Sequence, residues 1–272
     1  MSASPNRLGI ELLSTFGMPP LDFAALVGAL GCRNLSIGLT GLPMIDCGYP
    51  AWSLRDDAAL RLAFIAALRD HGVRISQGEG FLVRAGASVA DMAGDLDMMA
   101  EMGALAIGTA GMEPDQARAL DEFAQLAQMA GDRGLSVHLE FVPGLSVSDL
   151  AAALAIIEQV GQPHFCVMID AMHFFRSGGS IPQLVGVDPA RIGYIQLCDV
   201  PIAAANANYM AEAMTARYLP SEGELPLAEF VRALPKDAPI GLEVPNGSAT
   251  SQPGWQETRL RKAVAAARAL GA

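Results

Sequence analysis

A chain of 272 residues, 51% apolar and 17% charged, is long enough to bury a large core and matches the length of a single α/β barrel. Its formal net charge of −11 repels nucleic-acid phosphates and anionic lipids, which argues against nucleic-acid and membrane-surface partners. The opening MSASPNRLGIELL has no charged leader before a long apolar stretch, and no apolar run reaches about 18 residues. We therefore expect neither a signal peptide nor a membrane span.

Eight short apolar runs occur along the chain, and each predicts a strand. In chain order they are LGIELL (8–13), NLSIGL (34–39), RISQGEGF (74–81), LAIGTA (105–110), LSVHLEF (135–141), FCVMID (165–170), IGYIQLCD (192–199) and IGLEV (240–244). Their apolar residues are nearly continuous, as is typical of parallel strands that are covered on both faces.

The segments between these runs carry apolar residues at three- and four-residue spacing, which predicts amphipathic helices. The clearest are 54–70, 89–102, 115–130, 147–160 and 255–270. Glycines just before five of the strands are each predicted to end the preceding helix. They are Gly31, Gly72, Gly103, Gly134 and Gly161.

Eight strands that alternate with helices predict a (β/α)8 TIM barrel, with a single domain over residues 1–272. The alternative is an open doubly wound sheet, which usually carries a glycine-rich phosphate loop after its first strand. The stretch ELLSTFGMPP is no such loop, which favours the barrel. The connection from 200 to 223 is unusually long and has room for a short helix around 209–217. Long loops on this face of a barrel often cover the active site.

The four cysteines, Cys32, Cys47, Cys166 and Cys198, form no CxxC pair. Cys166 and Cys198 lie within apolar runs, where an unpaired cysteine behaves as a small apolar side chain. This pattern predicts a reduced, cytoplasmic protein.

Polar residues stand near the ends of the last four predicted strands: Glu140, Asp170, Gln196 and Glu243. In a barrel these strand ends converge on one mouth, where active sites are built. Three carboxylates buried together need a counter-charge, which a divalent cation supplies. The all-oxygen set favours Mg²⁺ or Mn²⁺, with Co²⁺ or Zn²⁺ as alternatives. The other interpretation is that each polar side chain is satisfied separately by hydrogen bonds.

With these residues, the chain resembles the xylose isomerase-like TIM barrels, the sugar phosphate isomerase/epimerase superfamily, over nearly its whole length. In that family the metal ligands are a Glu, an Asp, a His and a Glu on strands 5 to 8. Glu140, Asp170 and Glu243 match three of them. The DxxH spacing from Asp170 to His173 and the acidic stretch LPSEGELPL (219–227) are also similar.

Gln196 departs from the commoner family pattern, which has His at this position. The amide is neutral and offers a carbonyl oxygen, so metal binding can survive the exchange. Some dehydratase members of the superfamily are similar in having Gln there.

The resemblance and the chemistry of the side chains suggest roles. Glu140 and Glu243 are expected on opposite sides of a substrate, where one removes a proton and the other returns it. His173 either shuttles protons or fixes Asp170 or Glu140.

Three further residues are candidates for substrate binding. Arg217 is similar to a family arginine that faces the metal site, the alternative being an exposed loop charge. Arg176 either binds a substrate oxygen or forms a surface ion pair. Glu79, in QGEGF, points toward the mouth of the barrel.

The sequence therefore predicts a divalent-metal-dependent isomerase or epimerase that acts on a small, polyhydroxylated, keto-sugar-like compound through an enediolate. The first alternative is a dehydratase, a lyase of the 3-dehydroshikimate or inosose type. The second is a non-catalytic, metal-containing barrel subunit. No phosphate cradle is evident, which favours a non-phosphorylated small molecule as the partner, and a homo-oligomer is compatible with the sequence.

Overall fold

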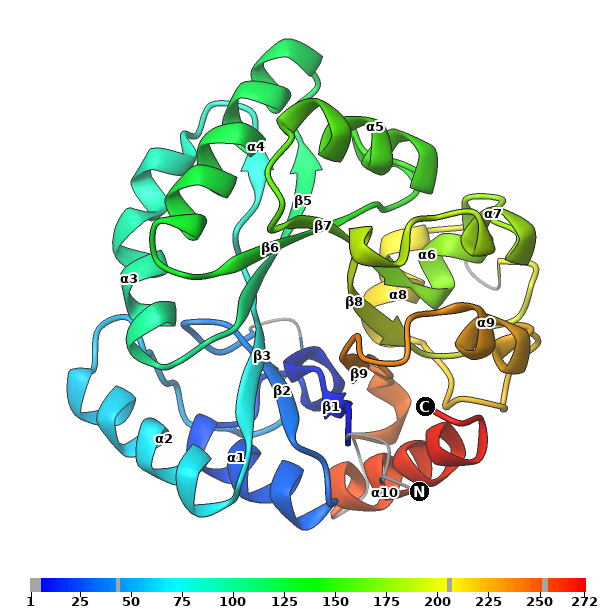
Figure 1. The fold of residues 1–272 in the computed structure, drawn as a ribbon. Coiled ribbons are helices and arrows are strands. Elements are labelled where there is room, and N and C mark those ends of the chain that lie inside the picture. The colour runs from blue at the N-terminus through cyan, green and yellow to red at the C-terminus, as the bar shows by residue number, and fades with distance from the viewer. Residues whose placement is uncertain (1–5, 43–44, 205–206, 251–253) are drawn as a thin grey trace.

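The computed structural model describes residues 6–42, 45–204, 207–250 and 254–272. Eight parallel strands form a closed barrel, and helices form a ring around it (Figure 1). The barrel strands are β1 (Leu8–Ile10), β2 (Asn34–Ile37), β3 (Arg74–Gly78), β5 (Ala106–Met112), β6 (Ser136–Glu140), β7 (Phe165–Asp170), β8 (Ile192–Leu197) and β9 (Ile240–Leu242). A pairing between β3 and β5 closes the ring, and the two-residue β4 (Val83–Arg84) extends beside β5. Each of the eight predicted runs overlaps one barrel strand, and β5 extends two residues beyond its run, so the predicted fold is confirmed.

Ten α-helices occur in the described residues. They are α1 (Pro20–Ala29), α2 (Ala58–Asp70), α3 (Ala93–Glu101), α4 (Gln116–Gly131), α5 (Leu150–Val160), α6 (Ala171–Arg176), α7 (Ile181–Val185), α8 (Tyr209–Thr215), α9 (Leu227–Ala233) and α10 (Trp255–Ala269). Short 3₁₀ helices are η1 (Leu12–Thr15), η2 (Val89–Met92), η3 (Pro189–Arg191) and η4 (Gly247–Ala249).

Local sequence explains where the long helices begin and end. Asp57, Asp115 and Asp149 each accept a hydrogen bond from a backbone N–H in the first turn of α2, α4 and α5. The five glycines predicted to end helices all have positive φ, between 65° and 75°. Glycine enters this conformation without the steric penalty of a Cβ atom, so the chain can turn there into the next strand.

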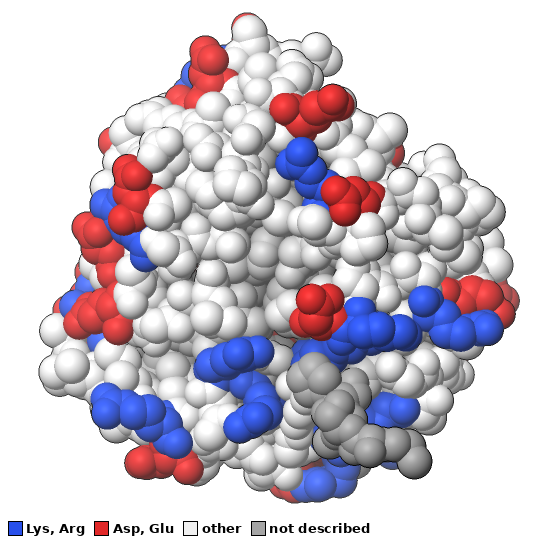
Figure 2. Space-filling view, in the orientation of Figure 1, with Lys and Arg blue, Asp and Glu red and all other residues white. Residues whose placement is uncertain are grey.

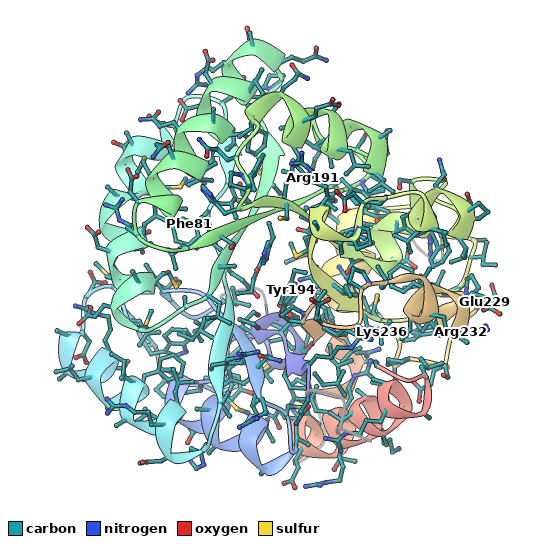
Figure 3. The ribbon with its side chains drawn as sticks, viewed as in Figure 1. Phe81, Arg191, Tyr194, Glu229, Arg232 and Lys236 are labelled. Atoms are coloured by element: carbon teal, nitrogen blue, oxygen red, sulfur yellow. The ribbon has the colours of Figure 1, made fainter. Side chains whose placement is uncertain are left out.

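The barrel interior is partly polar. His138 Nδ1 shares a hydrogen bond of 2.7 Å with Gln77 Oε1, and the His138 ring stacks on Tyr194 at 5.8 Å between centroids. Figure 3 shows Tyr194 within the ring of strands. Branched aliphatic side chains usually fill such an interior. The polar groups therefore mark a part of the barrel that serves more than packing.

Strand pairing brings the predicted site residues to neighbouring strand ends. Asp170 lies opposite Gln196 in the β7–β8 pair, and Glu140 ends β6 beside β7. Glu243 directly follows β9, the next strand after β8. These four side chains therefore occupy consecutive positions around one mouth of the barrel.

Charged side chains of both signs are interspersed on the face seen in Figure 2. One surface pair, Arg232 and Glu229, lies 3.2 Å apart at the rim (Figure 3). Exposed pairs of this kind add little stability, typically less than about 1 kcal/mol. Among the described helices, none has the length and apolar character needed to cross a membrane.

Candidate active site

Glu140, Asp170 and His173 form a compact group at the mouth. One ligand atom from each lies within 4.8 Å of the others. Asp170 caps the N-terminus of α6, where its Oδ1 accepts a hydrogen bond from the His173 backbone N–H at 2.8 Å. The His173 ring then lies with Nε2 at 3.5 Å from Glu140 Oε1 and Nδ1 at 2.5 Å from the Tyr209 hydroxyl. The DxxH spacing is thus one helix turn that begins at a strand end.

Arg217 joins two of the predicted carboxylates. Its Nη1 lies 2.5 Å from Asp170 Oδ2, and its Nη2 lies 2.8 Å from Glu243 Oε2. The residue is 1% exposed, and its backbone N–H donates to the Pro245 carbonyl oxygen at 2.8 Å. The long connection after β8 therefore carries this guanidinium into the site, and the exposed loop charge considered from sequence is not observed.

Gln196 presents a free acceptor to the same space. Its Nε2 donates to Glu243 Oε1 at 3.2 Å and to Glu11 Oε2 at 3.4 Å. Its Oε1 is buried and has no hydrogen-bond partner within the described part of the chain. A buried carbonyl oxygen normally has a partner. An unpaired oxygen beside carboxylates is the kind of ligand that a hard divalent cation takes.

Glu11, at the end of β1, was missed in the sequence analysis. It is fully buried and accepts a hydrogen bond from the Tyr194 hydroxyl at 2.6 Å. Gly241 makes room for it, because a Cβ there would lie 1.5 Å from Glu11 Oε1. The signal was similar to the one used for the last four strands, a polar residue within an otherwise apolar run, here LGIELL.

The other two predicted substrate-binding residues differ in position. Glu79 lines the cavity at the mouth and accepts a hydrogen bond from the Ser36 hydroxyl. Arg176 is absent from the described lining of that cavity. Its Nη2 pairs with Glu212 Oε1 at 2.9 Å and donates to the Pro201 carbonyl oxygen at 2.8 Å, which ties α6 to the long connection.

The carboxyl groups strongly perturb one another. Burial raises the pKa of Glu140 well above its usual range, and the charges of Glu243 and Asp170 raise it further. Burial also raises the pKa of Glu243, to about 8, although Arg217 opposes the shift. For Asp170, burial is outweighed by the charges of Arg217 and His173, which hold its pKa below the ordinary value. Burial lowers the pKa of His173 to about 4, so its ring is neutral near pH 7.

These residues fit a divalent cation. Glu79, Glu140 and Glu243 line the cavity, and Glu11 and Asp170 contact its lining residues Gln196 and Arg217, whereas Arg217 is the one arginine in the described lining. Burial, together with the charges of neighbouring acids, raises the pKa of Glu79, Glu140 and Glu243, and a bound metal ion would favour their charged forms. The unpaired oxygen of Gln196 adds a neutral ligand to the set.

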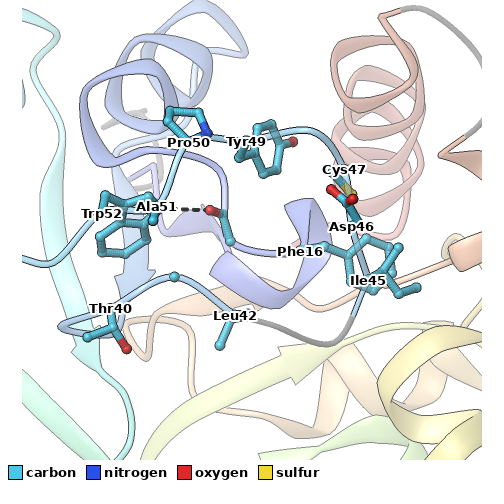
Figure 4. Close-up of a pocket in the computed structure, with 12 residues that line it drawn as sticks. Phe16, Thr40, Leu42, Ile45, Asp46, Cys47, Tyr49, Pro50, Ala51 and Trp52 are labelled. Carbon is cyan, nitrogen blue, oxygen red and sulfur yellow. Dashed lines mark hydrogen bonds between the residues drawn. The ribbon is translucent and has the colours of Figure 1, made fainter.

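Two of the cavities formed by the described residues adjoin each other at the mouth. The one that contains the acids has a volume of about 450 Å³ and is lined by Glu79, Glu140, Gln196 and Glu243, among others. The second, of about 390 Å³, is lined mainly by apolar and aromatic side chains, including Phe16 and Trp52 (Figure 4). The two share one wall at Leu42. Only the first combines several acids with an arginine among its described lining residues, so it is the candidate active site.

Replacing Glu11 with Leu is expected to weaken Mn²⁺ binding by about 10- to 100-fold, the usual effect of removing an outer partner of a metal ligand. The Gln196 amide would lose one of the two acceptors that direct its Nε2 away from the cation. Calorimetric titration with Mn²⁺ measures the change.

Glu11→Gln is the matched control for this prediction, because its amide oxygen can still accept from Gln196 and should retain most of the affinity. Equal affinities for wild type and Glu11→Leu would show that Glu11 does not orient the ligand.

Comparisons with known proteins support the fold. The model of the xylose isomerase-like TIM barrel family matches residues 24–270. A 3-dehydroshikimate dehydratase of Pseudomonas putida is 25% identical over 146 residues, which are 52% of this chain and 23% of that protein. The chain therefore spans less than a quarter of the length of that curated relative.

Two solved structures share the fold. A crystal structure of the IOLI protein with a zinc atom has a TM-score of 0.74 at 16% identity and covers 97% of this chain and 96% of that one. A D-psicose 3-epimerase, in the presence of D-fructose, has a TM-score of 0.73 at 15% identity and covers 97% and 99%. At these identities the likeness establishes the fold alone.

Proposed function

The chain belongs to the xylose isomerase-like TIM barrel family, and from this premise we propose that it is a divalent-metal-dependent isomerase or epimerase. Its substrate would be a small hydroxylated ketone, and its first step the removal of a proton from the carbon beside the carbonyl group. Glu140, Asp170, Gln196 and Glu243 would hold the metal ion, with Mg²⁺ or Mn²⁺ favoured by the oxygen ligands.

The observation that carries this proposal is that two glutamates occupy the first and the last position of the predicted ligand set. Glu140 ends β6, and Glu243 follows β9, with Asp170 and Gln196 on the two strands between them. Both glutamates line the cavity, and burial raises the pKa of Glu140 well above its ordinary value and that of Glu243 to about 8. Carboxyl groups with raised pKa values that face a cavity are suited to exchange protons with a bound substrate.

The remaining side chains would hold these two glutamates in place. When bound, the metal ion would polarise the substrate carbonyl group and stabilise the negative charge that develops on its oxygen. His173, fixed by Tyr209, would orient Glu140. Arg217 would hold Asp170 and Glu243 and balance part of their charge. A proton taken by one glutamate and returned by the other on the opposite face inverts the carbon, which is an epimerisation.

A dehydratase is the second candidate, and two observations favour it. Gln196 stands where the commoner family pattern has His, and the curated relative is a 3-dehydroshikimate dehydratase. The same proton removal leads to loss of water when a hydroxyl group leaves from the next carbon.

An experiment in D₂O separates these reactions. The Mn²⁺-loaded protein is incubated with ketoses, an inosose and 3-dehydroshikimate, and the products are followed by NMR. An isomerase or epimerase should place deuterium on the carbon beside the carbonyl group, whereas a dehydratase should release water and form an unsaturated ketone or an aromatic acid. Absence of both outcomes with these compounds and with apolar α-hydroxyketones, while the metal is bound, would contradict the proposal and favour a non-catalytic barrel.

A further inference from the structure

We infer that the substrate is a neutral ketone that carries an apolar group, and not a sugar phosphate or a sugar acid. This inference rests on the proposed function and names the class of substrate for the same site. Three features of the cavity lead to it: its charge, the engagement of its cationic side chain, and the apolar side chains at its mouth.

The charge of the cavity opposes an anionic ligand. Glu79, Glu140 and Glu243 line it, while Asp170 and Glu11 lie directly behind. One arginine and one divalent cation supply three positive charges, for which five carboxyl groups of the protein already compete. A phosphate or carboxylate group on the substrate would therefore be repelled by these acids unless it bound the metal ion directly.

No described cation in the cavity wall is free to bind an anion. Arg217 is the single Lys or Arg among the described lining residues, and its two terminal nitrogens are engaged by Asp170 and Glu243. The His173 ring is engaged by Glu140 and Tyr209. Sites that recognise phosphate or carboxylate groups usually supply an arginine fork or a lysine for them.

The walls away from the acids are apolar. The described lining includes four methionines and several aliphatic residues: Met112, Met168, Met210, Met214, Leu13, Leu42, Leu82, Val142 and Leu145. Met112 is 46% exposed and Met210 is 42% exposed.

Flexible apolar side chains that face water around a cavity are typical of surfaces that bind apolar groups of varied shape. A fully hydroxylated sugar would leave these side chains without a suitable partner. An alkyl or aryl substituent on the ketone would cover them, and the apolar cavity beyond Leu42 lies beside the same wall (Figure 4).

Two matched pairs of α-hydroxyketones test this inference on the Mn²⁺-loaded protein. The first pair is phenacyl alcohol and its para-carboxylate; the second is dihydroxyacetone and dihydroxyacetone phosphate. Every probe carries the same chelating carbonyl and hydroxyl groups. Calorimetry gives the affinity, and water-proton relaxation of the Mn²⁺ reports whether a probe displaces bound water.

We expect phenacyl alcohol to bind at least about 10-fold more tightly than dihydroxyacetone, because its ring buries apolar surface. Each anionic probe should bind at least about 10-fold more weakly than its neutral partner. An anionic probe that binds as tightly as its partner, or dihydroxyacetone that matches phenacyl alcohol, would overturn the inference while leaving the proposed function intact. If the protein holds Mn²⁺ and none of the probes displaces water, the proposed function itself fails, and the inference with it.

A substitution at the mouth adds a test that does not disturb the fold. Met112→Arg places a cation on a half-exposed side chain of the cavity wall. It should shift the affinity ratio of each pair toward the anionic probe by about 2- to 5-fold, as expected for an exposed ion pair. Met112→Gln, neutral and of similar length, should leave the ratio unchanged. A ratio that Met112→Arg does not move would show that charge does not set the preference.

Discussion

Replacing Glu243 with Gln is expected to leave a folded protein that has lost its tight metal site. After loading with Mn²⁺ and desalting, the wild type should retain about one ion per chain, as a closed set of oxygen ligands would. The variant should retain none. Its affinity for Mn²⁺ should be more than about 100-fold lower, because removing a metal ligand reduces the affinity more than removing a residue that only orients a ligand. Turnover should fall by more than about 100-fold, since a proton-transfer group is lost as well.

Glu212→Gln is the matched control for this substitution. Glu212 is also buried and also pairs with an arginine, Arg176, yet it is absent from the described cavity lining. Its replacement should leave Mn²⁺ binding unchanged. Elemental analysis and calorimetry measure both variants, and circular dichroism verifies that they fold.

The Glu243 experiment also separates two ligand sets. Glu140, Asp170 and His173 already approach one another closely enough to hold an ion without Glu243. Unchanged Mn²⁺ affinity in Glu243→Gln would assign the ion to that group and contradict the set of four strand-end residues.

The barrel and the positions of its last four polar residues follow from pattern alone, since parallel strands in a barrel all end at one mouth. Glu11 was missed although the same rule applies to it. Closure of the barrel brings β1 beside β9, with Ile10 opposite Leu242, so the first strand end adjoins the last one. Glu11 is therefore far from Glu243 in sequence but lies on the neighbouring strand end in the closed ring.

Helix geometry explains why His173 and Arg176 differ. Three residues advance a helix by about 300°, which returns His173 to the side of Asp170. Six residues advance it by about 600°, so Arg176 points about 120° away, toward Glu212. The position of the Arg217 side chain could not be predicted from sequence spacing, because it depends on backbone contacts between segments that are distant in the sequence. Asp199 pairs with Tyr218, and the Arg217 N–H bonds to Pro245.

Replacing Arg217 with Met should destabilise the metal-free protein by about 3–5 kcal/mol, the usual cost of leaving buried charges without their partner. In the described residues, Arg217 is the guanidinium that pairs with both Asp170 and Glu243. Urea unfolding in the presence of EDTA measures the loss. Mn²⁺ at 100 times its Kd should stabilise the wild type by about 2.7 kcal/mol, because it binds only the folded state.

The same concentration of Mn²⁺ should increase the free energy of unfolding of Arg217→Met by more than it does for the wild type. The reason is that the ion supplies positive charge to carboxylates that have lost the Arg217 guanidinium. Arg176→Met is the matched control, since it breaks a buried ion pair with Glu212 outside the described cavity lining and should lose stability that Mn²⁺ does not restore. If Arg217→Met were less stable than the wild type by the same amount with and without Mn²⁺, the arginine and the metal ion would not neutralise the same acids. If the deficit shrinks only for Arg217→Met, the arginine and the metal ion neutralise one cluster of acids. The long connection after β8 then contributes to the metal site through charge, although it supplies none of the proposed ligands.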